Sequence, residues 1–66
     1  MNLTVNGESM KFEQAVSLVQ IMKQLKIEDQ VMAAAVNMEV VKKESWSQYQ
    51  PKDGDTIEML HFVGGG

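Results

Sequence analysis

The 66-residue chain contains neither cysteine nor arginine. Without cysteine it can form no disulfide, no thiolate metal site and no cysteine nucleophile of its own. Without arginine it lacks the side chain that most often makes two-point contacts with phosphate and guanine. Its six lysines are scattered, and nine acidic residues outnumber them to give a formal net charge of −3. We therefore do not expect nucleic-acid binding.

Long hydrophobic runs are also missing. No stretch approaches the roughly 20 apolar residues that cross a membrane, and the first residues do not form an apolar run of the signal-peptide type. We expect a soluble protein of the cytoplasm with no membrane contact. A chain this short also has little room for a deep substrate cleft walled by its own residues.

Histidine occurs once, as His61, and no partner serine, cysteine or second histidine forms a catalytic or metal-binding constellation with it. Asp53 and Asp55 flank a glycine, which is typical of turn residues rather than of an acid pair. The sequence therefore predicts no catalytic residue, no metal site and no enzyme.

The first dozen residues predict a β-hairpin. Asn2 to Val5 alternates polar and apolar side chains, as a half-buried strand does. Asn6-Gly7 follows, and this pair favours the two-residue turn in which both residues have positive φ. Glu8 to Phe12 then forms the returning strand.

A helix is expected next, over residues 17 to 26. Ser17 and Gln20 have the spacing of a capping box, in which each side chain bonds the backbone N–H of the other residue. Four apolar residues follow at helical spacing and form one stripe: Leu18, Ile21, Met22 and Leu25.

The second half predicts further strands. The run 31–36 has strand length, although its alanines would also suit a closely packed helix. A turn at 37–39, a short strand at 40–41, a helical turn at 44–49 carrying Trp46, and a last strand at 56–62 follow. The helix supplies the crossover that lets the first and last strands pair in parallel. We therefore expect an α+β roll over residues 1–62, with a mixed sheet of four to five strands packed on one main helix.

One helix covers only one face of such a sheet. The last strand alternates between two sets of side chains, Ile57, Met59 and His61 against Glu58, Leu60 and Phe62. If the helix covers the first set, then Leu60 and Phe62 lie on the open face, where exposed apolar side chains often mark an interface. We predict partner docking by Glu58, Leu60 and Phe62; the alternative is that a loop covers the two apolar side chains.

Residues 63–66, Val-Gly-Gly-Gly, predict a flexible tail. Glycine has no Cβ, so such a tail can enter a channel too narrow for side chains. A carboxylate is a poor electrophile until it is adenylated, and an enzyme that adenylates it needs a terminus that reaches beyond the folded body. We expect the carboxylate of Gly66 to be the functional group. The alternative is an inert linker or a frayed end.

Several short motifs resemble those of the ThiS family, the ubiquitin-like sulfur carriers of bacterial thiamine biosynthesis. The resemblance rests on the Asn-Gly hairpin and on the segments 33–37, 40–46, 53–58 and 61–66. It implies a β-grasp fold. It also implies that Gly65 and Gly66 form the reacting end and that Val63 and Gly64 are a spacer.

The resemblance further implies the partners. A ThiF-like adenylyltransferase that uses ATP and magnesium would adenylate the terminal carboxylate. A sulfur donor, either a cysteine desulfurase or a persulfide protein, would convert it to a thiocarboxylate, which a ThiG-like thiazole synthase would consume. The carrier itself would need no cofactor and would be a monomer when free.

Three other interpretations remain open. A MoaD-like small subunit of molybdopterin synthase shares the fold and the terminal glycine pair, although such chains are generally longer and often carry proline and alanine before the glycines. A ubiquitin-like modifier would end in an isopeptide bond. A non-covalent β-grasp interaction module would have an inert tail.

Overall fold

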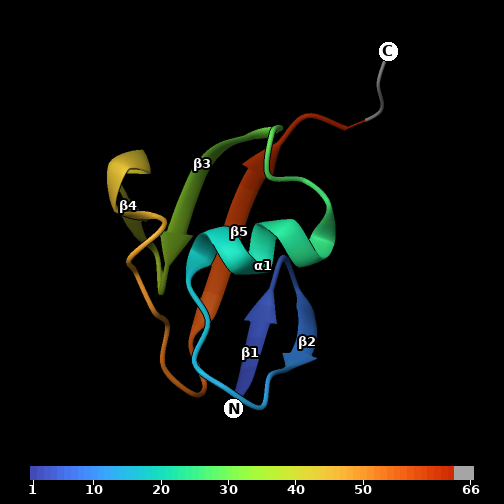
Figure 1. Ribbon diagram of the computed structural model, residues 1–66, viewed down its shortest axis with the longest axis vertical. Helices are drawn as coiled ribbons and strands as arrows, with labels where there is room; N and C mark the ends of the chain where they lie inside the picture. Colours follow the sequence, from blue (N-terminus) through green and yellow to red (C-terminus); the bar gives the residue numbers. More distant parts are fainter. Residues whose placement is uncertain (64–66) are drawn as a thin grey trace.

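The computed structural model describes residues 1–63 of the chain. Their elements are β1 (Asn2–Val5), β2 (Glu8–Lys11), α1 (Leu18–Leu25), β3 (Val31–Val36), β4 (Glu39–Val41), the 3-10 helix η1 (Lys43–Ser45) and β5 (Thr56–His61) (Figure 1).

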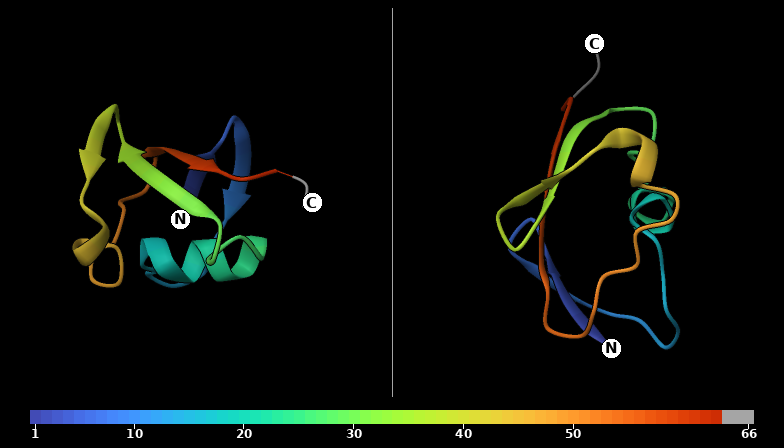
Figure 2. Two further views of the ribbon diagram at one scale, coloured as in Figure 1. Left: turned by 90° about the horizontal axis from the view of Figure 1, so that it is seen from above. Right: turned by 90° about the vertical axis from the view of Figure 1, so that its left-hand side faces the viewer.

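All five strands form one sheet in the order β2-β1-β5-β3-β4. The central strand β5 is parallel to β1, and every other pair is antiparallel. Helix α1 packs on one face of the sheet, and no α-helix within residues 1–63 covers the other face (Figure 2). This arrangement confirms the predicted β-grasp roll with one main helix.

Two-residue turns close both hairpins. Asn6 and Gly7 have φ values of 50° and 84°, which confirms the predicted turn between β1 and β2. Asn37 and Met38 have φ values of 50° and 71° and join β3 to β4 in the same way. Since two residues suffice here, β4 begins at Glu39, one residue before the predicted strand. Methionine gives no sequence signal for a positive φ.

The capping box of α1 is present. Ser17 Oγ accepts a hydrogen bond of 3.1 Å from the backbone N–H of Gln20, and Gln20 Oε1 accepts one of 2.8 Å from the N–H of Ser17. At the other end Lys26 adopts φ 63°, and its N–H donates to the carbonyl oxygen of Lys23 at 3.0 Å. The predicted range 17–26 therefore equals the helix plus one capping residue at each end.

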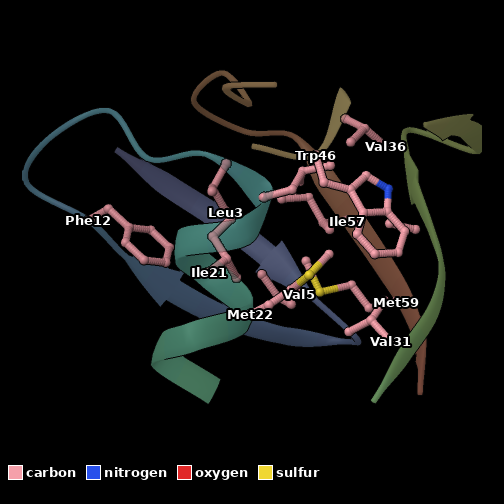
Figure 3. Packing of buried hydrophobic residues seen from close by; sticks show 12 residues of the cluster. Leu3, Val5, Phe12, Ile21, Met22, Val31, Val36, Trp46, Ile57 and Met59 are labelled. Carbon is pink, nitrogen blue, oxygen red and sulfur yellow. The ribbon is translucent and has the colours of Figure 1, made fainter. Parts of the chain in front are cut away.

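The core lies between α1 and the sheet (Figure 3). Its completely buried large side chains are Leu3, Leu18, Ile21, Met22 and Ile57. Trp46, directly after η1, is only 5% exposed, and its Nε1–H donates to the carbonyl oxygen of Val41 at 2.8 Å. This bond gives the indole N–H an acceptor in place of the water that burial of the ring excludes. The helical turn predicted over residues 44–49 is the shorter η1, which begins one residue earlier and ends before Trp46, its C-cap residue.

Candidate functional site

Strand β5 carries the chain to its glycine-rich end. It lies between β1 and β3 in the middle of the sheet, so its direction is set from both sides. After β5 the chain leaves the sheet at the end of the molecule opposite to the N-terminus (Figure 1). The predicted roles of Gly64, Gly65 and Gly66 fall outside the described residues and stay predictions.

The predicted alternation of β5 is confirmed. Ile57 and Met59 are buried beneath α1, whereas Glu58 is exposed on the opposite face. Leu60 is 62% exposed and Phe62 is 64% exposed, so no loop within residues 1–63 covers them. Their exposure is what an interface requires. The docking role of Glu58, Leu60 and Phe62 itself stays a prediction.

A shallow hollow lies beside these residues on the open face. Ala33 pairs with Leu60, and Ala35 pairs with both Glu58 and Val40. The two small alanine side chains form its floor between the larger Val40 and Leu60, and its volume is about 310 Å³. We call it the alanine groove. Its only charged lining residue is Glu58.

The open face is therefore divided into two halves. The groove occupies the part formed by β5, β3 and β4. On the β1–β2 part, Thr4 pairs with Ser9. Thr4, Ser9 and Lys11 alternate along their strands with side chains that point toward the core, so all three lie on the open face. Polar side chains thus cover the β1–β2 half, whereas the other half has an apolar groove beside the polar Thr56 and Glu58, which favours contact at the β5–β3–β4 half.

Asparagines of the two hairpin turns hold β5. Asn6 Oδ1 accepts a hydrogen bond of 2.7 Å from the N–H of Met59, and the N–H of Asn6 donates to Ile57 O at 2.9 Å. Asn37 Oδ1 accepts one of 2.9 Å from the N–H of Thr56, whose carbonyl oxygen accepts from the N–H of Asn37 at 2.7 Å. The sequence suggested turn conformations for these asparagines but not these bonds.

The carboxylates before β5 organise the turn, as predicted. Asp55 accepts hydrogen bonds from the N–H of Lys52 at 2.9 Å and from Asn37 Nδ2 at 3.0 Å. The Lys52 N–H, and then the Asn37 amide, lower the pKa of Asp55 below its usual value because they stabilise the charged form. Asp53 Oδ1 accepts from the N–H of Asn2 at 2.6 Å.

Within residues 1–63 no three histidine, cysteine, aspartate or glutamate side chains gather in a way that could hold a metal ion. None of the helices in this part of the chain is long and apolar enough to cross a membrane.

The helix, the mixed sheet and the glycine-rich extension of its central strand place the chain in the class of ubiquitin-like β-grasp proteins. A model of the ThiS family matches residues 3–66, and the chain belongs to this family. The match covers almost the whole chain and includes all three terminal glycines.

Individual relatives agree with this membership. The sulfur carrier protein ThiS of Bacillus subtilis (strain 168) is 31% identical over 65 residues, which are 97% of this chain and 98% of that protein. The crystal structure of a thiamine biosynthesis protein (ThiS) from Geobacter metallireducens superposes with a TM-score of 0.78, at 34% identity and with complete coverage of both chains.

A third relative is much longer. The thiazole synthase of Paramagnetospirillum magneticum (strain ATCC 700264 / AMB-1) is 33% identical over 66 residues. These residues are 100% of this chain but only 20% of that protein, so the chain spans one fifth of this relative's length.

Proposed function

We propose that this chain carries sulfur, as a thiocarboxylate on Gly66, for the formation of the thiazole of thiamine in the cytoplasm. The observation that carries the proposal is the ThiS family match, which extends through the terminal glycines. The chain acts as a co-substrate in this scheme and not as a catalyst.

The chemistry has three stages. A carboxylate oxygen of Gly66 attacks the α-phosphorus of ATP, and pyrophosphate leaves with its electron pair. The terminal sulfur of a donor persulfide then attacks the activated carbonyl carbon, and AMP leaves. A second thiol cleaves the sulfur–sulfur bond, forming a disulfide with the donor sulfur and leaving the thiocarboxylate on the glycine.

This chemistry depends on how far the carboxylate of Gly66 can extend from the folded domain. If extended, the four residues from Val63 to Gly66 would span roughly 13 Å, at about 3.3 Å each. Removing Gly65 and Gly66 would withdraw the carboxylate by about 7 Å, whereas a misplacement of about 1 Å can already slow a reaction severely. The pairing of β5 with β3 continues to His61, the last residue of the strand, and gives this reach a fixed starting point.

Three kinds of partner are implied. An adenylyltransferase of the ThiF type, using ATP and magnesium, activates the carboxylate. A cysteine desulfurase or a persulfide protein supplies sulfur. A thiazole synthase of the ThiG type accepts it. The long thiazole synthase relative supports the last partner, because one fifth of that protein matches this whole chain.

We assign the docking of the activating enzyme to Glu58, Leu60 and Phe62 with the adjoining alanine groove. A bulky apolar side chain of the enzyme fits over the small floor of Ala33 and Ala35. Its burial would remove exposed apolar surface from water and offset the roughly 1–2 kcal/mol that ordering each tail residue costs.

The test is the intact mass of the protein after incubation with a ThiF-type enzyme, ATP, magnesium and a persulfide donor. Exchange of one oxygen for sulfur is expected in the complete chain, and none in a chain lacking Gly65 and Gly66. An unchanged mass with an enzyme of proven activity would refute the proposal. Complementation of thiazole and molybdopterin auxotrophs then identifies the acceptor, and rescue of only the molybdopterin strain would favour the MoaD-like role.

A further inference from the structure

A second hollow lies on the other face of the sheet, close to the start of the tail. It is bounded by the β1–β2 hairpin, the segment at the end of α1 and the last residue of β5, and its volume is about 290 Å³. Its lining residues are Val5, Asn6, Glu8, Met10, Leu25, Ile27 and His61. We call it the helix-side hollow.

The lining combines two kinds of surface. Met10, Leu25 and Ile27 are half-buried aliphatic side chains that pack on the edge of the core. Glu8 is exposed and is the only acidic lining residue, and no lysine lies among the lining residues. Aliphatic walls with one carboxylate, together with the polar side chains of Asn6 and His61, match a side chain that has an aliphatic stem and a hydrogen-bonding cationic head, which is the chemistry of arginine and lysine.

The two hollows flank the end of β5. Leu60 lines the alanine groove on the open face, and His61, the next residue, lines the helix-side hollow on the opposite face. His61 Nδ1 lies 3.0 Å from the carbonyl oxygen of Phe62, the first residue beyond the strand. Contacts in both hollows would therefore hold the chain from two sides where it leaves the sheet.

We propose that the helix-side hollow receives an arginine or lysine side chain of the enzyme that adenylates the tail. The proposal rests on the sulfur-carrier function proposed above. Apolar contact in the alanine groove supplies affinity but little orientation. A charge pair at Glu8 adds orientation and faster encounter, because opposite charges steer and fix partners.

Other occupants fit less well. A purely apolar side chain would remove water from the Glu8 carboxylate without replacing its hydrogen bonds, which is costly. A second copy of this chain would have to place one of its own lysines there. Self-association would then depend on Glu8 and would appear in the absence of any enzyme.

The test compares equal charge changes inside and outside the hollow. Glu8→Lys and Glu8→Gln alter the hollow, and Glu13→Lys and Glu13→Gln alter an exposed glutamate in the loop after β2. Affinity for a ThiF-type adenylyltransferase is measured by calorimetry at two salt concentrations, and the intact mass reports adenylation and sulfur transfer. Thermal unfolding checks that each variant is folded, and Glu8→Gln serves if Glu8→Lys fails this check.

We expect Glu8→Lys to weaken binding about tenfold or more, and Glu8→Gln by a smaller factor with a weaker salt dependence than the unchanged protein. The Glu13 variants should stay within about twofold. Equal effects at Glu8 and Glu13 would overturn the proposal, as would Glu8-dependent dimerisation without enzyme. If the unchanged chain is adenylated but the Glu8 variants bind normally, only this inference fails. If the unchanged chain is not adenylated, the sulfur-carrier function fails instead.

Discussion

The side chain of Asn6 accepts a hydrogen bond of 2.7 Å from the backbone N–H of Met59 and so joins the first hairpin to the strand that leads into the tail. Strand β1 pairs with β5 only at Thr4–Thr56 and Val5–Ile57, because the chain turns away at Asn6. The Asn6 side-chain oxygen thus accepts the hydrogen bond that the backbone of a further β1 residue would otherwise accept. The link between β1 and β5 therefore continues past the last strand residue of β1.

Replacing Asn6 by glycine should lower the free energy of unfolding by about 1–2 kcal/mol, since a partly buried N–H loses its acceptor. Glycine tolerates the φ of 50° at this position, so the loss isolates the hydrogen bond. Asn6→Ala should cost more because it adds backbone strain. Urea unfolding measures both variants, and Asn6→Asp, which keeps an acceptor, is the control. Equal stability of the glycine variant and the unchanged protein would contradict this role.

Asp55 should make the free energy of unfolding depend on pH. Its pKa is lowered in the folded chain from the usual 3.8, so the unfolded chain binds this proton more tightly. The stabilisation is fully present above the usual pKa and is lost as the pH falls through the lowered, folded value. In Asp55→Asn the free energy of unfolding should therefore fall less steeply as the pH is lowered, measured by urea unfolding from about pH 5 to about pH 2. Glu13→Gln is the control. An equally steep fall in Asp55→Asn and in the unchanged protein would contradict the assignment.

Trp46→Phe should lower the free energy of unfolding by about 1–3 kcal/mol. The change removes the donor to Val41 O and leaves space where the larger ring was buried. Far-ultraviolet circular dichroism in urea is the measurement, because the variant has no tryptophan to report by fluorescence. Trp46→Tyr, which brings a hydroxyl instead of the indole N–H, should also be destabilised. Unchanged stability in both variants would show that the bond and the packing contribute little.

Local patterns predicted most of this fold. The Asn6-Gly7 pair, the Ser17–Gln20 capping box and the alternation of β5 each depend on residues close together in the chain, and each is present in the structure. The alternation, with the condition that the helix covers Ile57 and Met59, also placed Leu60 on the open face.

What the sequence did not reveal depends on register between distant segments. The alanine groove exists because Ala33 and Ala35 lie opposite Leu60 and Glu58, and no local pattern specifies that pairing. The bond from Met59 to Asn6 spans 53 positions of the chain for the same reason. In the run 31–36 the alanines were compatible with either helix or strand, and only pairing with β5 and β4 decides between them.

Leu60→Asp should separate docking from folding. The side chain is 62% exposed on the open face, so the free energy of unfolding should change by no more than about 0.5 kcal/mol. Affinity for the adenylyltransferase should fall about tenfold or more, because a charge would enter an apolar contact. Ser9→Asp adds the same charge on the polar half of that face and is the matched control. Parallel losses of stability and affinity in Leu60→Asp would instead make Leu60 a structural residue.

Ala33→Leu tests the groove without adding a charge. Ala33 is exposed and forms part of the floor, so a larger side chain should fill the hollow while the core beneath stays unchanged. If the adenylyltransferase inserts a side chain between Val40 and Leu60, binding should weaken by about tenfold, although the surface has become more apolar. If the enzyme only rests on a flat apolar surface, the added methyl groups should leave binding equal or stronger. Calorimetry with the unchanged protein, Ala33→Leu and Ala33→Ser distinguishes the two modes, since the serine variant keeps the hollow open.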